Sequence, residues 1–462
     1  MTQKRQSSLV VLFLLFELTA LLVLASDGRG NAYLYTCVPL IVFIFGGWLI
    51  VSRMRGDIAL FLDAAMLLTF GAMIQCMLLK ENEPPVAFIV QIILSMIVAV
   101  ACGIAYKKVP AIASARGTTI LFGLSVLLYV MTLLIGASAG DGVTNWIRVP
   151  GLGTVQPSEF IKVFYVLIMA GLLCTTENPS PRRVIAAVGV TFANLGFLAL
   201  QGEFGTILLI VATSICLMFL FVDTKMFAMY FGFWAVCGGA GVAVVKAVYA
   251  ATGGKSSNFF LRQLIKIYNR VFITADSDPN GAGYQVHQAR KALLNSHFFG
   301  SETSTYMPNS SNDMVFPALT ERCGLCIALA VCLLFAFLLI RGTRIYFRSK
   351  DRYHACVAAG LVCQLVLQSY IIIGGSIGVL PLTGITLPLI SRGGSSLMST
   401  CIMIALILVI STNRLWDGRR IYHTYAAKLQ KKGERAVKRV SGLRNGAGNR
   451  GSGNNAGRSG KP

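Results

Sequence analysis

The chain has 462 residues, of which 55% are hydrophobic and only 13% are charged, and its mean hydropathy is +0.68. Soluble domains carry about twice that share of charged residues, so this composition excludes a soluble globular protein. The formal net charge is +22, and residues 417–462 contribute close to half of it. A basic segment that directly follows a membrane span is typical of topology signals and of contacts with anionic lipid. We therefore expect no nucleic-acid partner.

Twelve apolar runs are each about long enough to cross a ~30 Å hydrocarbon core as a helix. They lie near residues 7–26, 33–52, 58–79, 86–106, 117–138, 157–175, 184–200, 205–221, 226–250, 318–340, 353–375 and 393–412. With the N-terminus inside, fifteen Lys and Arg residues fall on the cytoplasmic side and four on the short outer loops. The sequence therefore predicts an all-α, polytopic membrane helical bundle of about twelve spans with both termini in the cytoplasm.

One connection is far longer than the others and gives the chain its predicted organisation. Residues 251–317 form a single large extracytoplasmic loop, and connections longer than about 12–15 residues are usually functional or disordered. Its many aromatic residues favour packed structure. The predicted regions are 1–139 with spans 1–5, 140–250 with spans 6–9, this loop, 318–412 with spans 10–12, and a basic, disordered tail at 413–462.

Ionisable residues within spans are candidates for function, because each costs about 2.5–3.5 kcal/mol at mid-helix. They are Glu17, Asp63, Glu159, Lys162, Lys246, Glu321 and Arg322. For Glu159 and Lys162, a mutual i,i+3 ion pair on one helix face explains their presence in a span as well as a functional role does. Glu17 and Lys246 are equally compatible with snorkelling or interfacial positions. Cys323 and Cys326 have the spacing of a metal pair but lack a second pair, so no protein metal site is predicted.

Asp313 stands where the chain re-enters the membrane after the long loop. A partly buried carboxylate at that point is suited to accept a proton from a hydroxyl group. Asn312 and Asp313 also precede an apolar run, which is the position of a helix N-cap. The spacing alone favours the cap.

Proline and glycine are concentrated at 374–394, just before the last span. They predict a re-entrant or bent segment, which is allowed only where the backbone faces protein or water. Such a segment serves equally well as the floor of a cavity or as a direct contact for substrate through its backbone N–H groups.

Four segments, in chain order, carry recognisable motifs. They are NWI at 145–147 followed by QPSEFIK at 156–162; QGEFGT at 201–206; DPNGAGYQ at 278–285 with Gln288, then NDMVF at 312–316 and Glu321; and LPLTGITLPLISRGGSS at 380–396. These segments resemble sequence elements of the SEDS family, which includes RodA, FtsW and SpoVE. In the same order, the family elements are RWI and QPSExxK; QPDxGT; DPxGxGYQ, then TDFIF and a following Glu; and LPxTGxxLPFxSxGGSS.

The resemblance implies a peptidoglycan glycosyltransferase that polymerises lipid II into glycan strands at the outer face of the bacterial plasma membrane, in division, elongation or sporulation. Asp313 falls on the position of the catalytic base. It would deprotonate the C4 hydroxyl of an acceptor sugar, which displaces undecaprenyl pyrophosphate with inversion. The implied substrate-binding residues are Gln156, Glu159, Lys162, Trp146, Tyr284, Gln285, Gln288, Glu321, Arg392 and Ser395.

The pyrophosphate of the leaving group requires positive charge, for which Lys162, Arg148, Arg270 and Arg392 are candidates, and a motif supports only Lys162. The resemblance also implies assistance by a divalent cation, Mg or Mn. It further implies a class B penicillin-binding transpeptidase as partner, together with other divisome or elongasome membrane proteins.

The chain departs from the family pattern in ways that identify a divergent member. Five spans precede the first motif where the family has three, so an extra pair is added to a core of ten. Asn145 replaces a common Arg, and Gln201-Gly202-Glu203 replaces Gln-Pro-Asp. The alternatives are a flippase or transporter of lipid-linked precursors and a catalytically silent division scaffold. The concentration of polar residues in an outer loop, rather than at mid-membrane, disfavours a transporter.

Overall fold

The computed structural model describes residues 11, 13–20, 22, 30–79, 86–138, 144–149, 153–175, 179–272, 283–301, 305–413 and 415. Its helices are α2 (Gly30–Met54), α3 (Ile58–Met77), α4 (Val86–Lys108), α5 (Ala115–Ile135), α6 (Pro157–Leu173), α7 (Pro181–Gln201), α8 (Phe204–Phe221), α9 (Thr224–Thr252), α10 (Phe259–Phe272), α11 (Tyr284–Leu294), α12 (Val315–Cys323), α13 (Leu325–Arg348), α14 (Arg352–Ser376) and α15 (Gly394–Ser411), with one 3-10 turn, Pro110–Ala113.

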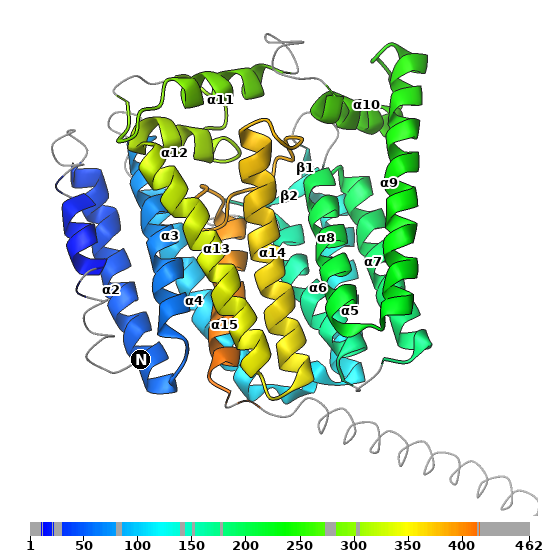
Figure 1. Ribbon diagram of the computed structural model, residues 1–462, viewed down its shortest axis with the longest axis horizontal. Helices are drawn as coiled ribbons and strands as arrows, with labels where there is room; N and C mark the ends of the chain where they lie inside the picture. Colours follow the sequence, from blue (N-terminus) through cyan, green and yellow to red (C-terminus); the bar gives the residue numbers. More distant parts are fainter. Residues whose placement is uncertain are drawn as a thin grey trace, which may run out of the picture.

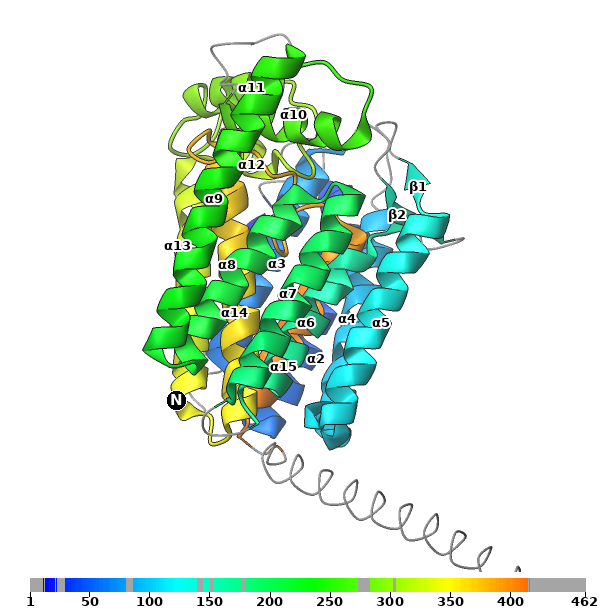
Figure 2. The same cartoon turned by 90° about the vertical axis from the view of Figure 1, so that its right-hand side faces the viewer.

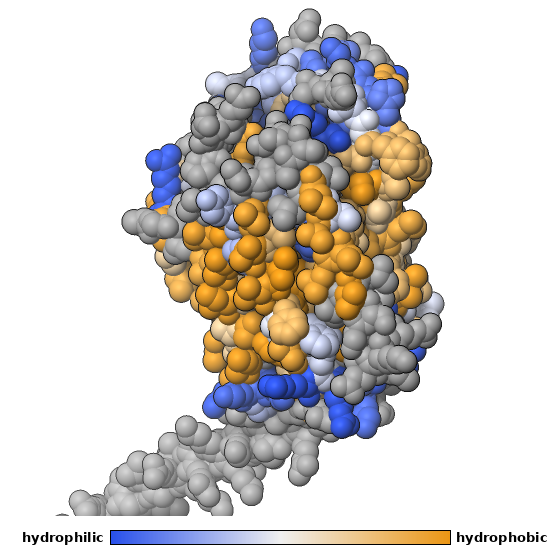
Figure 3. Space-filling model, turned by 90° about the vertical axis from the view of Figure 1, so that its left-hand side faces the viewer, coloured by the Kyte–Doolittle hydropathy of each residue, from blue (hydrophilic) through white to orange (hydrophobic). Residues whose placement is uncertain are grey.

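Ten of the described helices are long and apolar enough to cross a membrane, namely α2 to α5, α7 to α9 and α13 to α15. The helix α6 has 17 residues and also runs within the bundle (Figure 1). Of the predicted first span, residues 13–20 are described and are helical. The motif residues 278–282 and the tail beyond residue 415 lie outside the described residues. On the face shown in Figure 3, hydrophobic residues form a belt between two hydrophilic ends.

The helices α10 and α11 lie across one end of the bundle, above the spans (Figures 1 and 2). We call this the loop end and the opposite one the far end. Both helices fall within the predicted loop 251–317, so that loop contains ordered helical structure, as its aromatic residues indicated.

The prediction of one span at 318–340 was wrong, because two helices replace it. The helix α12 ends at Cys323 and α13 begins at Leu325. Gly324 between them has φ +92° and ψ 162°, a region open essentially to glycine alone. A Cβ added to Gly324 would lie 2.4 Å from the carbonyl oxygen of Phe298, so the close approach of residues 298–300 also requires glycine here.

A small antiparallel sheet at the loop end was not predicted by the all-α assignment. It consists of β1 (Ala137–Ser138), β2 (Thr144–Val149) and β3 (Gly153–Val155) in the order β1-β2-β3. Ile147 pairs with Val155 and Val149 with Gly153. Trp146 and Arg148, two of the predicted site residues, therefore project from β2.

The helices at the centre of the bundle are α3, α6, α14 and α15, whose residues are mostly buried. Helices that are apolar on all sides belong in the interior of a large protein or in a membrane.

The interfacial position considered for Glu17 is wrong, because Glu17 is fully buried. Its carboxylate accepts hydrogen bonds from Tyr33 of α2 at 2.8 Å and from Thr69 of α3 at 2.5 Å. It thus joins the first helical segment to α2 and α3.

Candidate functional site

Asp313 lies at the loop end, in the turn that leads into α12. The residue at the N-cap position of α12 is Met314, and no side chain forms a capping hydrogen bond there. The cap interpretation of Asp313, which the spacing favoured, is therefore wrong. Its carboxylate is available for another role.

Three segments that are distant in the sequence meet at this carboxylate. A Cβ built on Gly384 would lie 3.6 Å from Oδ2 of Asp313 and 3.7 Å from Nη1 of Arg270. The same guanidinium donates a hydrogen bond from Nη1 to the carbonyl oxygen of Thr383 at 3.1 Å. Gly384 has φ +71°, and any side chain at this position would enter the space between the two charged groups. The helix α10, the turn before α12 and the segment before α15 thus form one site.

The surroundings of Asp313 raise the pKa of its carboxyl group to about 6. Burial is the larger cause, because it disfavours the charged form, and the positive charge of Arg270 opposes it. A carboxylate with this pKa is mostly ionised at neutral pH and is more basic than an ordinary Asp. It is suited to accept a proton from a hydroxyl group.

The backbone just before Asp313 is hydrogen-bonded to the segment before α15 and to α3. Ser391 donates from Oγ to the carbonyl oxygen of Asn312 at 2.8 Å. The backbone N–H of Arg392 donates to the carbonyl oxygen of Ser311 at 2.8 Å. Gln75 of α3 donates to the carbonyl oxygens of Ser311 at 2.9 Å and of Ile390 at 3.0 Å. These bonds fix the position from which Asp313 projects.

A second cluster lies deeper in the bundle, between α6, α14 and α15. Lys162 forms the predicted i,i+3 ion pair with Glu159 at 2.8 Å, and both side chains are buried. Lys162 also donates to Oε1 of Gln368 at 3.0 Å, and Ser399 donates to Glu159 at 3.0 Å. Gln368 in turn donates to the carbonyl oxygen of Thr386 at 2.9 Å. The cluster therefore supports the irregular segment between α14 and α15.

That segment matches the predicted region 374–394, since α14 ends at Ser376 and α15 begins at Gly394. It is buried at several positions, including Leu387 and Ile390. Its backbone N–H at Leu387 donates to Oγ of Ser391 at 2.8 Å. Non-helical backbone at this depth is tolerated because protein groups satisfy it. The first turn of α15, which follows this segment, is also bound to the first motif, because the N–H of Gln156 donates to Oγ of Ser395 at 3.2 Å.

The remaining predicted residues lie in other surroundings. Both carboxylate oxygens of Glu321 accept hydrogen bonds from the N–H of Thr305, at 3.0 and 3.1 Å. Glu321 therefore orders the loop segment that leads to Asp313. Tyr284, Gln285 and Gln288 lie on α11, which packs against α12 through Ala289 and its neighbours. Trp146 lies on β2. A direct contact between these side chains and substrate stays a prediction.

Sequence reasoning missed several contributors to the site. Arg270 was one of four candidate cations, with no motif to distinguish it from the others. Gln75 and Gln368 were not selected at all, although an amide within a 20-residue apolar run is a signal of the same kind as a buried charge. Gly384 lies within the last motif, but only its contact with the two charged groups shows why a side chain is excluded there.

Within the described part of the chain, no three His, Cys, Asp or Glu side chains come together as metal ligands. The charged neighbour of Asp313 is a guanidinium, which does not fit a metal site. The residues described here therefore do not form a protein cage for a divalent cation.

A family model described as cell cycle protein, covering FtsW, RodA and SpoVE, matches residues 57–415. The chain belongs to this family. It is 28% identical to the peptidoglycan glycosyltransferase RodA of Mycobacterium tuberculosis over 305 residues, which cover 62% of this chain and 61% of that protein. It is also 28% identical to the probable peptidoglycan glycosyltransferase FtsW of Idiomarina loihiensis over 384 residues, 79% of this chain and 89% of that protein.

Stage V sporulation protein E of Bacillus subtilis is 28% identical over 302 residues, 63% of this chain and 78% of that protein. Two solved structures share the fold. A chain of a peptidoglycan synthase complex superposes with a TM-score of 0.62 at 22% identity, covering 78% of this chain and 99% of that one. RodA of Thermus thermophilus superposes with a TM-score of 0.52 at 20% identity, covering 78% and 98%. The chain is therefore an integral membrane protein with a RodA-like fold.

Proposed function

We propose that this protein is a peptidoglycan glycosyltransferase that polymerises lipid II at the outer face of the bacterial plasma membrane. The observation that carries the proposal is the carboxylate of Asp313, with a pKa of about 6, next to the guanidinium of Arg270. Its relatives named peptidoglycan glycosyltransferases support the same reaction. The loop end, with α10 and α11, would face outward, and both termini would lie in the cytoplasm.

In the proposed reaction, Asp313 accepts the proton of the acceptor C4 hydroxyl as that oxygen attacks C1 of the donor sugar. The new C1–O4 bond forms while the bond from C1 to the pyrophosphate oxygen breaks, with inversion at C1. The departing undecaprenyl pyrophosphate carries the negative charge away. A base and a cation on the two sides of the reacting carbon are what such a displacement requires.

Arg270 is a suitable cation for the pyrophosphate, because it is exposed and shares the site with Asp313. Lys162 is buried, with 1% of its side chain exposed, and is bound to Glu159 and Gln368. We therefore infer that Lys162 acts as a positioning residue for the segment before α15. Lys162 would bind the pyrophosphate only if its ion pair with Glu159 opened.

A divalent cation, Mg or Mn, would be held by the pyrophosphate of the substrate rather than by a protein cage, since no suitable cluster exists among the described residues. No step above passes through it. We further propose twelve spans, formed by a ten-span core and the pair that contains α2. A class B penicillin-binding transpeptidase would be the partner, consistent with the fold shared with a chain of a peptidoglycan synthase complex.

The test is glycan-strand formation from purified lipid II by the full chain in detergent, with and without a co-expressed transpeptidase. We expect polymer from the wild type and a loss of at least about 10²-fold in Asp313→Asn, which keeps the shape and removes the base. Equal polymer from both proteins would refute Asp313 as the base. Silence from both with the partner present, under conditions where a known polymerase is active, would favour the scaffold or flippase instead.

A further inference from the structure

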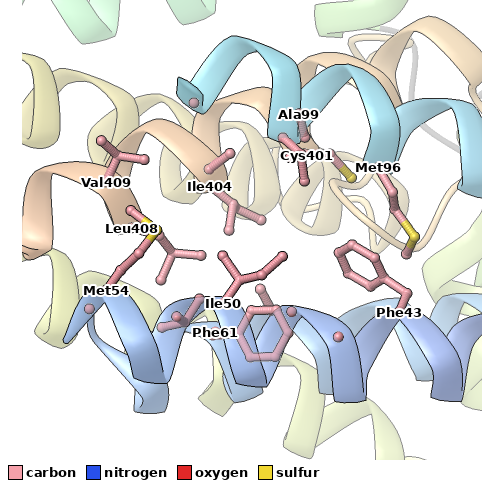
Figure 4. A pocket seen from close by; sticks show the side chains of 18 of the residues that line it. Phe43, Ile50, Met54, Phe61, Met96, Ala99, Cys401, Ile404, Leu408 and Val409 are labelled. Carbon is pink, nitrogen blue, oxygen red and sulfur yellow. The ribbon is translucent and has the colours of Figure 1, made fainter. Parts of the chain in front are cut away.

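A cavity of about 870 Å³ lies away from Asp313, between α2, α3, α4 and α15 (Figure 4). It falls in the size range of small-ligand sites, about 300–1,000 Å³. Apolar side chains such as Phe43, Ile50 and Met96 line it, and Figure 4 shows them pointing into the space between α2 and α4. We call this cavity the α2–α4 groove. The mechanism proposed above does not use it.

The groove exists because small residues leave space that no neighbouring helix fills. A Cβ built on Gly46 of α2 would meet no atom within 4 Å, although this residue lines the groove. Glycine in a membrane helix usually allows a second helix to approach closely, and here none does. At the floor the packing is tight, since a Cβ on Gly103 of α4 would lie 3.3 Å from Val409 of α15.

The length of the groove matches one leaflet of a membrane. Its lining runs from Phe43 to Met54 on α2 and from Met96 to Lys108 on α4. At 1.5 Å per residue these stretches are about 17–18 Å long. Half of the hydrocarbon core is about 15 Å thick. An acyl chain that enters from the far end would therefore lie along the groove for its whole length.

The polar end of the groove carries positive charge. Lys107 and Lys108, the last two residues of α4, line it and are both exposed. Arg53 lies in the last turn of α2, which ends at the same far end of the bundle. Basic pockets between membrane helices on the cytoplasmic side suit anionic lipid head groups. An apolar channel with two lysines at its mouth is complementary to a lipid with an acyl tail and a phosphate.

We propose that the α2–α4 groove binds an anionic phospholipid of the cytoplasmic leaflet, with an acyl chain along α2 and α4 and its phosphate at Lys107 and Lys108. The proposal rests on the orientation stated under the proposed function. One wall of the groove, α2, lies outside the residues 57–415 that match the family. The lipid would fasten this added helix to the family core and so gives the N-terminal addition a function.

The test is lipid retention by the full chain, reconstituted in nanodiscs of equal phosphatidylglycerol and phosphatidylcholine and then released for native mass spectrometry. Two basic charges near the mouth predict that phosphatidylglycerol is retained about thirtyfold over phosphatidylcholine. Lys107→Gln/Lys108→Gln should remove most of this preference. The matched control Arg116→Gln/Lys225→Gln neutralises two exposed basic residues at the far end that do not line the groove, and should keep it.

Gly46→Trp should obstruct the groove and reduce the number of retained lipids by one. Gly123→Trp is the matched control, because a Cβ on Gly123 of α5 also meets no atom within 4 Å but the residue is exposed outside the groove. Unchanged retention in Gly46→Trp, or an unchanged preference in the lysine double variant, would overturn the proposal. Preferential retention of added undecaprenyl phosphate would also overturn it, by assigning the groove to the substrate tail. These readouts do not depend on polymerase activity, so they can succeed where the proposed function fails.

Discussion

Replacing Arg270 by Gln tests whether its charge lowers the pKa of Asp313, against the larger effect of burial. Both groups lie within 4 Å of the same point beside Gly384, so their charged atoms are at most about 7 Å apart. At an effective dielectric constant of about 20, two unit charges at this distance interact by about 2.4 kcal/mol. Because Arg270 is exposed, solvent screening reduces this to roughly half, about one pKa unit.

Arg270 lowers the pKa of Asp313, so its removal should raise that pKa from about 6 to about 7. A base is active when deprotonated, and kcat/KM for polymerisation should therefore rise with pH through this value and then level off. In Arg270→Gln we expect the inflection to move upward by about one unit. Arg270→Lys keeps the charge and should keep the inflection near that of the wild type.

The assay is the initial rate of polymer formation from lipid II at limiting substrate between pH 5 and 9. The absolute rate also falls if Arg270 binds the pyrophosphate, so the position of the inflection, rather than the rate, is the readout. An inflection in Arg270→Gln that equals the wild-type value, or lies below it, would refute the electrostatic argument.

Three further variants test the supporting structure. Gly324→Ala places a Cβ against the carbonyl of Phe298 and should lower Tm in detergent, with a cost of about 1–3 kcal/mol from backbone strain; an unchanged Tm would contradict the need for glycine. Glu159→Gln leaves Lys162 buried without its counter-ion and should cost about 3–5 kcal/mol in unfolding experiments, whereas adding Lys162→Met should recover most of it. A double variant no more stable than the single one would show that the ion pair is not the cause. Glu321→Ala removes the acceptor for the N–H of Thr305, so its amide hydrogen should exchange about tenfold faster or more; equal exchange would rule out the ordering role.

Several properties of the fold follow from the sequence because they depend on local composition. Apart from the run at 318–340, the apolar runs in the described part of the chain predict the spans to within a few residues, as for 205–221 against α8. This follows because a membrane helix must satisfy its own backbone hydrogen bonds. The i,i+3 pair of Glu159 and Lys162 is a property of one helix, and the structure contains it. The motif resemblance identified the family and selected Asp313.

Other properties depend on contacts between distant segments, and no local pattern determines them. The sequence offered Arg270 as one of four cations, and only the packing of α10 over the segment before α15 places it beside Asp313. Spacing favoured Asp313 as a helix cap, but the start of α12 at Val315 leaves that role unused. The hydropathy pattern did not predict the helix break at Gly324, because hydropathy carries no information on backbone conformation and the positive φ of Gly324 lies within an apolar run.

The burial of Glu17 shows the same division between local and tertiary information. The sequence determined that a carboxylate lies in an apolar segment, and therefore that it needs a partner or an interfacial position. Only the tertiary structure decided between these, by bringing Tyr33 and Thr69 from two other helices to its oxygens. Composition determines which residues are costly to bury in a membrane. The hydrogen-bond donors that offset this desolvation come from other helices, and they reach the carboxylate only when the helices pack.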